Sequence, residues 1–130
     1  MEAFELADIE LRRRAHGTRY HEFLRRASMS LGLYVLPAGG TDPQQPHTED
    51  EAYLVMRGRA RIRVANEERA VEPGSVVFVP AGVEHRFHDI TEELSVAVMF
   101  SPAEGLAKQR WTRAEARCLL GTVWDLSGFY

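Results

Sequence analysis

Residues 39–58 read GGTDPQQPHTEDEAYLVMRG, and residues 74–89 read GSVVFVPAGVEHRFHD. Each stretch contains a short run of apolar and β-branched residues with glycine or proline beside it, a pattern typical of a strand between turns. Each also carries side chains that bind metals, His47 and Glu51 in the first stretch and His85 in the second. These two stretches therefore predict the class of fold and the place of a site.

Similar strand-like runs continue on both sides of these stretches. Asn66 and Glu67 lie between two of the runs and indicate the tip of a hairpin. No helices alternate with the runs, so the pattern predicts an all-β sandwich or barrel rather than a parallel α/β sheet. The predicted strands cover residues 29–37, 51–58, 59–65, 75–81 and 94–100.

The apolar residues change their parity near Gly58. Before this glycine, Glu51, Tyr53 and Val55 share one face of the predicted strand, because side chains alternate along a strand. After it, the apolar residues take even positions, which predicts a bulge or bend at Gly58. The odd positions then form an arginine stripe on the solvent face, made of Arg57, Arg59, Arg61 and Arg63.

The chain of 130 residues has the size of one domain, with 45% hydrophobic and 27% charged residues. Its 16 basic and 19 acidic residues give a formal charge of -3, without the basic excess that nucleic-acid binding requires. The single cysteine, Cys118, excludes an internal disulfide and a cysteine-based zinc site. We find no secretory signal and no run of about 20 apolar residues. We therefore expect a cytoplasmic protein without nucleic-acid or membrane partners.

We divide this one domain into three segments. Residues 1–28 form an N-terminal extension with a short helix that ends at Gly17, residues 29–102 form the barrel, and residues 103–130 contain a C-terminal helix and an aromatic tail. The aromatic side chains of the tail, Trp124, Phe129 and Tyr130, are costly to expose to water, so we expect the tail to dock on the barrel or on a second subunit. A homodimer is the expected assembly.

The metal-binding side chains follow the period of a strand. Gln45, His47, Glu49 and Glu51 share parity, and a barrel can bring His85 from a distant strand to the same interior point. Two imidazoles and one carboxylate form a facial set for a divalent first-row metal and leave coordination positions open. His47, Glu51 and His85 can form such a set.

The spacing of these residues in two gapped motifs resembles the cupin family. The first motif is glycine, five residues, His-x-His, three or four residues, glutamate, six residues and glycine; here Gly39 begins it, Gln45-Pro46-His47 and Glu51 follow, and Gly58 ends it. The second motif begins at Gly74, continues through Pro80-Ala81-Gly82 and His85, and ends at Asp89. The resemblance covers residues 29–102 and is closest to small, single-domain bacterial cupins of the conserved-barrel (cupin-2) kind.

The resemblance implies a double-stranded β-helix, or jelly roll, with one metal inside the barrel held by His47, Glu51 and His85. The sequence departs from the family pattern at Gln45, where the first motif histidine is expected, and at Asp89, where asparagine is expected. Gln45 can coordinate through its carbonyl oxygen, or it can stay off the metal and hydrogen-bond a bound water or substrate. Gln44 and Glu49 are alternative donors.

Two classes of function remain open from the sequence. The first is an enzyme that uses one divalent transition metal (Fe, Mn, Ni or Zn) on a small molecule, in an oxygenase-like (dioxygenase-like) or isomerase-like reaction. Its acid/base candidates are Tyr34, Tyr53 and His88, although His88 has the opposite parity to His85 and should point out of the barrel. The second is a non-catalytic cupin that binds or senses a ligand. Bound metal with turnover favours the first class, and a metal-free protein that binds an apolar ligand favours the second.

Overall fold

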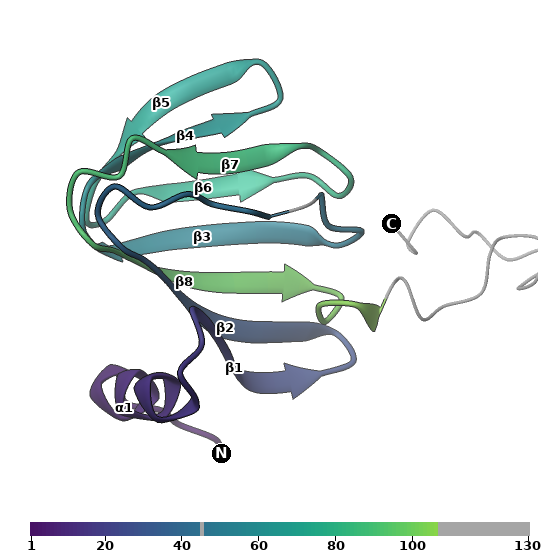
Figure 1. Ribbon diagram of the computed structural model, residues 1–130. Coiled ribbons are helices and arrows are strands. Elements are labelled where there is room, and N and C mark those ends of the chain that lie inside the picture. Colours follow the sequence, from purple (N-terminus) through teal and green to yellow (C-terminus); the bar gives the residue numbers. More distant parts are fainter. Residues whose placement is uncertain (45, 107–130) are drawn as a thin grey trace, which may run out of the picture.

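The computed structural model describes residues 1–44 and 46–106 (Figure 1). In these residues the chain forms one helix followed by eight strands. Their bounds are α1 Leu6–His16, β1 Tyr20–Arg26, β2 Met29–Leu36, β3 Asp50–Arg57, β4 Ala60–Val64, β5 Glu67–Val71, β6 Val76–Val79, β7 His85–His88 and β8 Leu94–Ser101. The predicted C-terminal helix and aromatic tail, like Gln45 and Cys118, lie outside the described residues.

The strands form two antiparallel sheets that enclose one core (Figure 1). The larger sheet has the strand order β1-β2-β8-β3-β6, and the smaller has the order β5-β4-β7. Both sheets contribute to one cluster of buried side chains, because Tyr53 and Val96 of the larger sheet pack with Ile62 and Phe87 of the smaller. The order, in which β8 lies between β2 and β3, is that of a jelly roll, so the prediction of an all-β barrel is confirmed.

Five of the eight strands coincide with predicted runs, and three do not. The strands β2, β3, β4, β6 and β8 were predicted, whereas β1, β5 and β7 were not. β1 pairs with β2 along most of its length, so the larger sheet includes part of the segment that we assigned to an N-terminal extension. The sequences of β1 and β5, YHEFLRR and EERAV, are rich in charged residues because each strand is at the edge of its sheet.

The predicted bend near Gly58 is present. The pairing of β3 with β8 shifts its register between Val55 and Arg57, and Gly58 follows with a φ of 89°. Beyond it, Ala60 and Ile62 are buried, while the arginines of the predicted stripe are exposed. After the bend the apolar side chains point into the barrel and the arginines point into solvent. This is the change of parity that the sequence predicted.

Replacing Gly58 with alanine is expected to cost more stability than the same change at Gly74. Both glycines have a positive φ, 89° and 95°, so alanine at either position costs about 1–2 kcal/mol of backbone strain. At Gly58 a Cβ would also overlap the carbonyl oxygen of Glu93 and lie 2.8 Å from Leu94 Cα, whereas at Gly74 it would meet nothing within 4 Å. Gly58→Ala should therefore lose a further ~1–3 kcal/mol in urea unfolding. Equal losses for the two variants would contradict the close approach at Gly58.

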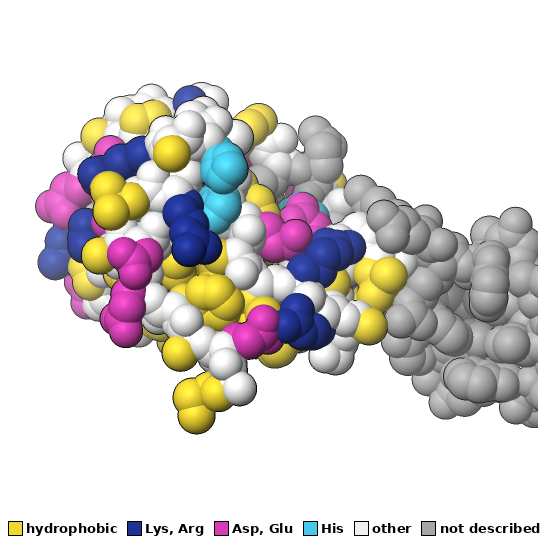
Figure 2. All heavy atoms as spheres, turned by 90° about the horizontal axis from the view of Figure 1, so that it is seen from below, with side chains coloured by type: hydrophobic (Ala, Val, Ile, Leu, Met, Phe, Trp, Pro, Cys, Tyr) yellow, Lys and Arg dark blue, Asp and Glu magenta, His cyan; other side chains and the backbone are white. Residues whose placement is uncertain are grey.

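The helix α1 covers part of the outer face of the larger sheet (Figure 1). Its buried residue Ile9 packs against Leu33 and Val35, which point away from the barrel interior on β2. As predicted, Gly17 ends the helix: its φ is 67°, and its N–H donates to the carbonyls of the last turn. Figure 2, which looks from the side of α1 and β1, shows acidic and basic side chains intermixed on this face. Within the described part of the chain, no helix has the length and apolarity to cross a membrane.

Candidate metal centre

His47, Glu51 and His85 meet at the end of the barrel where β3 and β7 begin (Figure 1). Glu51 is the second residue of β3, His85 is the first residue of β7, and His47 lies in the loop that precedes β3. The backbone N–H of Gly82 donates to the carbonyl of His47 at 2.6 Å, which joins the two motifs directly. One ligand atom from each of the three side chains lies within 4.8 Å of the others. The predicted set of ligands is therefore brought together.

The pair formed by His85 and Glu51 is fully buried, with 1% of each side chain exposed. His85 Nδ1 is 2.9 Å from the carbonyl oxygen of Val83, so Nδ1 carries a proton and donates it there. His85 Nε2 then faces Glu51 Oε1 at 2.8 Å, yet neither this nitrogen nor either carboxylate oxygen has a well-formed hydrogen bond within the described residues. A nitrogen lone pair and a carboxylate that face each other in a buried place are stabilised by a cation. Two imidazoles and one carboxylate suit a divalent transition metal, so these residues fit the predicted ion.

The raised pKa of His85 indicates that this place favours positive charge. Burial by itself lowers the pKa, but the Glu51 carboxylate and the Val83 carbonyl outweigh burial and raise it above the ordinary value of 6.5. The carboxylate of Asp42 acts in the same direction. A proton on Nε2 and a metal ion at Nε2 therefore compete for the same lone pair.

Metal affinity is expected to decrease as the pH is lowered, and the decrease should begin above pH 6.5. The reason is that the pKa of His85 in the metal-free protein is raised, so a proton competes with the metal already at that pH. The metal-free protein should respond in the opposite sense. Its protonated His85 contributes stability that is complete below pH 6.5 and is lost as the pH rises through the raised pKa. Thermal unfolding between pH 6 and 8, with and without Zn²⁺, checks both signs. His85→Ala should remove this pH dependence, and an unchanged dependence in that variant would contradict the assignment.

His47 lies at the mouth of the site, with 17% of its side chain exposed. Its Nε2 is 3.2 Å from Gln44 Oε1, and its Nδ1 is 3.9 Å from Glu104 Oε1. The edge of its ring packs on Phe100, with the ring centroids 4.8 Å apart, and the centroid of the His85 ring is 5.7 Å away. An aromatic wall and two polar neighbours thus orient this imidazole.

A buried carboxylate that the sequence did not single out, Asp42, holds the loop before β3 in place. Asp42 is 3% exposed and accepts hydrogen bonds from Tyr34 Oη at 2.7 Å and from the backbone N–H of Phe87 at 2.9 Å. It also accepts from the backbone N–H and the side-chain Nε2 of Gln44, at 3.3 and 2.9 Å. The Nε2 contact fixes the orientation of the Gln44 amide, so its oxygen faces His47 and the hydroxyl of Tyr53. Asp42 therefore links β2, β7 and the loop to the site.

Tyr34 and Tyr53, two of the acid/base candidates, use their hydroxyls as hydrogen-bond donors. Tyr34 donates to Asp42, and Tyr53 donates to Gln44 Oε1 at 3.2 Å. Burial raises the pKa of both tyrosines far above neutrality, and the neighbouring Asp42 and Glu51 carboxylates add to the rise at Tyr34 and Tyr53 respectively. Phenols of this kind position their partners and do not act as bases near neutral pH.

The other candidate residues take different places. Gln45 lies outside the described residues, while Gln44, one of the alternative donors, lies beside His47. Glu49 is 1% exposed and accepts a hydrogen bond from Thr48, but it is not one of the three grouped side chains. Asp89 has a φ of 48°, a left-handed conformation that asparagine and aspartate tolerate, which explains why Asp replaces Asn at the end of the second motif.

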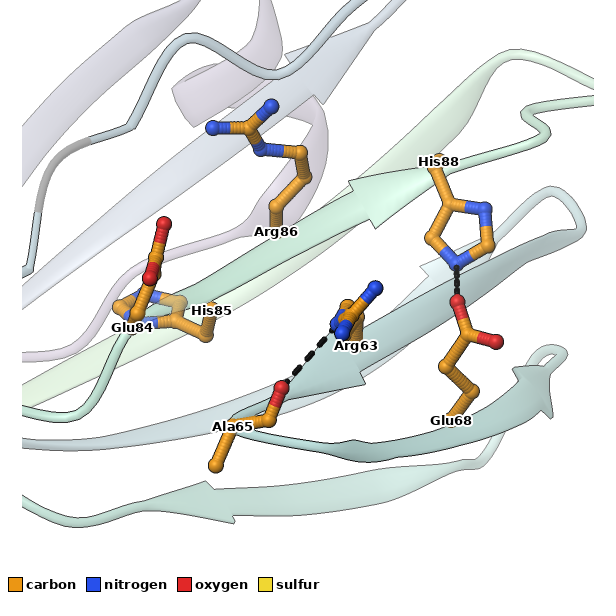
Figure 3. Close-up of a pocket in the computed structure, with 7 residues that line it drawn as sticks. All are labelled: Arg63, Ala65, Glu68, Glu84, His85, Arg86 and His88. Atoms are coloured by element: carbon orange, nitrogen blue, oxygen red, sulfur yellow. Dashed lines mark hydrogen bonds and ion pairs between the residues drawn. The ribbon is translucent and has the colours of Figure 1, made fainter.

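A small cavity lies beside His47, and a wider groove lies along β4 and β7. The cavity has a volume of about 140 Å³, and His47, Tyr20, Tyr34 and Glu104 contribute to its lining. The groove has a volume of about 440 Å³. Figure 3 shows that charged residues of both signs line it, Arg63, Glu68, Glu84 and Arg86, together with His85 and His88. We take the cavity as the binding space because His47 lines it and because it has aromatic walls.

Comparison with known proteins supports this description. A model of the cupin domain (Cupin_2) matches residues 32–101. An uncharacterised protein of Streptomyces coelicolor is 54% identical over 104 residues, which cover 80% of this chain and 99% of that protein. The structure of TT1209 from Thermus thermophilus is similar with a TM-score of 0.63 and 25% identity, covering 79% of this chain and 99% of that chain.

The DMSP lyase DddQ of Ruegeria pomeroyi DSS-3 has a related fold, with a TM-score of 0.58 and 22% identity. The match covers 64% of this chain and 47% of that one, so this chain spans about half of the lyase. The cupin domain model covers both motifs and the strands β3 to β8 of the jelly roll. The chain belongs to the cupin family, and its fold is the cupin double-stranded β-helix.

Proposed function

We propose that His47, Glu51 and His85 hold one divalent transition metal and that this cupin is an enzyme acting on a small molecule. The observation that carries the proposal is the convergence of two imidazoles and a carboxylate, in which the buried Nε2 of His85 and Oε1 of Glu51 face each other at 2.8 Å. A buried imidazole lone pair that faces a carboxylate is costly unless a cation lies between them. The DMSP lyase DddQ, whose fold is similar, supports the idea that a barrel of this type can carry a reaction on a small molecule.

The chain's own residues determine what such a site can do. A divalent metal bound there would supply a Lewis acid for a substrate oxygen. The carbonyl of Val83 fixes the tautomer and direction of the His85 ring. The ring of Phe100 limits the access of water to His47. Gln44, held by Asp42, accepts a hydrogen bond from Tyr53 and faces His47 Nε2, so it orients the His47 ring.

The metal content of protein purified without chelator tests the proposal. We expect about one divalent ion per chain in the wild-type protein and in His88→Ala. His88 is the matched control because its side chain points outward and pairs with Glu68 at 2.9 Å. His47→Ala should lose most of the ion. Equal trace amounts of metal in all three proteins would contradict the metal site, and a loaded protein that binds small molecules without turnover would favour the ligand-binding function over the enzyme.

We also propose a homodimer, supported by an apolar area on the outer face of the larger sheet. Leu54, Val76, Phe78 and Met99 are 40%, 69%, 61% and 41% exposed. They are neighbours, because Leu54 pairs with Val76 and Ala52 pairs with both Phe78 and Met99. Contiguous apolar surface is typical of a face that another chain covers. We expect sedimentation to show a dimer for the wild-type protein and a monomer for Phe78→Lys, and a monomeric wild type would contradict this assembly.

A further inference from the structure

The cavity beside His47 has the size of a binding site for one small molecule. Its volume is about 140 Å³. An engineered cavity of about 150 Å³ in another protein binds benzene, so a molecule of six or so heavy atoms fits a space of this size. The lining combines apolar and polar side chains, which is typical of ligand sites. It consists of Tyr20, Tyr34, Gln44, His47, Val98, Phe100 and Glu104.

The hydroxyl of Tyr20 is an unused hydrogen-bond donor in this lining. The Oη atom is buried and has no hydrogen-bond partner among the described residues. The ring lies over Gly32 of β2, where any Cβ would overlap it, and it packs against Tyr34 with a centroid distance of 6.2 Å. The absence of a side chain at Gly32 thus makes room for this ring beside the cavity. A buried donor without a partner is costly, and an acceptor on a bound molecule would satisfy it.

The electrostatic field in the cavity disfavours negative charge. Glu104 lines it, and the carboxylates of Glu22, Glu49 and Glu51 all raise the pKa of Glu104, after burial as the largest cause. Arg25 acts on Glu104 in the opposite sense, but it is paired with Glu22 at 2.9 Å. The Glu104 carboxylate lines the cavity and lies 3.9 Å from His47 Nδ1, so a second carboxylate bound there has a negative neighbour. An anionic ligand would meet the same repulsion that Glu104 meets.

We propose that this cavity binds a small molecule that has no negative charge and whose oxygen accepts a hydrogen bond from Tyr20. The inference rests on the proposed function only in placing this molecule beside a metal held by His47. The geometry of the cavity, the unpartnered hydroxyl and the surrounding carboxylates carry the rest. Uncharged amides, ketones and alcohols belong to this class, and carboxylates of the same shape do not.

Three probes of nearly identical shape separate the two requirements. Butyramide is uncharged and has an acceptor oxygen, butyrate has the oxygens and a negative charge, and butyramidinium is cationic and has no acceptor. Each is titrated into the metal-free full chain at pH 7.5 and followed by NMR through the signals of Val98 and Phe100. We expect butyrate to bind at least ~10-fold more weakly than butyramide, which is about 1.4 kcal/mol. Equal affinity of butyrate and butyramide would overturn the proposal.

Two variants assign the effects to their residues. Tyr20→Phe should weaken butyramide about fivefold and leave butyramidinium within twofold, because only the amide accepts the hydrogen bond. Glu104→Gln should narrow the difference between butyramide and butyrate. Unchanged butyramide affinity in Tyr20→Phe would overturn the role of the hydroxyl. Repeating the titrations with Zn²⁺ separates the two proposals: failure to bind Zn²⁺ counts against the metal site, and loss of probe selectivity counts against the cavity.

Discussion

Replacing His85 with alanine is expected to remove nearly all metal from the protein. His85 supplies one of three grouped donors and is the partner of Glu51 at 2.8 Å. Losing an outer-shell partner costs roughly 10–100-fold in metal affinity, and losing a direct ligand should cost more. Without the ring, the buried Glu51 carboxylate also lacks its nearest positive partner, so the metal-free variant should be less stable as well. Titration of the variant with Co²⁺ or Zn²⁺ against a competing chelator measures the loss.

His88→Ala is the control for this change. It removes an imidazole from the same strand, β7, but at a position whose side chain pairs with Glu68 outside the barrel. Its metal affinity should match that of the wild-type protein. If His85→Ala bound metal as tightly as His88→Ala, then the metal would not be held by this donor set.

Replacing Asp42 with asparagine is expected to destabilise the fold by about 3 kcal/mol. The carboxylate of Asp42 accepts four hydrogen bonds, one from Tyr34, two from Gln44 and one from Phe87. An asparagine amide turns one acceptor oxygen into a donor that faces these donors, and hydrogen bonds to a buried charge are worth about 1.5–3 kcal/mol. The melting temperature should fall by roughly 10 °C. Metal affinity should fall as well, because the Gln44 amide and the loop that carries His47 lose their support.

Asp89→Asn is the matched control for Asp42→Asn, because it makes the same chemical change at an exposed position. Asparagine tolerates the φ of 48° at residue 89, so this variant should keep its stability within about 0.5 kcal/mol. Thermal and urea unfolding compare the two variants. Equal stability of both would show that Asp42 does not hold the loop.

The sequence predicted the features that depend on spacing. The two-residue period placed Glu51 and Tyr53 inside the barrel, and the change of parity at Gly58 placed the arginines outside, because alternation along a strand is local and needs no tertiary information. The metal-binding residues followed from the two gapped motifs. The strands β3 to β6 connect the two motifs, and their lengths return the chain to the same end of the barrel. His47 and His85 therefore meet although 37 residues lie between them in the sequence.

The sequence did not predict the features that depend on long-range contacts. Asp42 resembles an ordinary loop residue, and its role arises because the loop crosses β7 and offers a carboxylate to the N–H of Phe87. The charged edge strand β1 has no apolar alternation that would separate it from an extension. The hydrogen bond from the Gln44 amide to Asp42 likewise depends on the folded loop and could not be predicted from the motif. The one weak signal in the sequence is an aspartate two residues before a glutamine, in a loop that leads to predicted metal ligands.

A crystal structure of the full chain grown with Co²⁺ tests the central claim most directly, through an anomalous difference map collected at the cobalt edge. The account predicts one strong peak per chain, in contact with His47, Glu51 and His85. The same crystals of Glu51→Gln should show a weak peak or none. A peak held by other residues, such as the outward pair of His88 and Glu68, with none between His47, Glu51 and His85, would contradict the account.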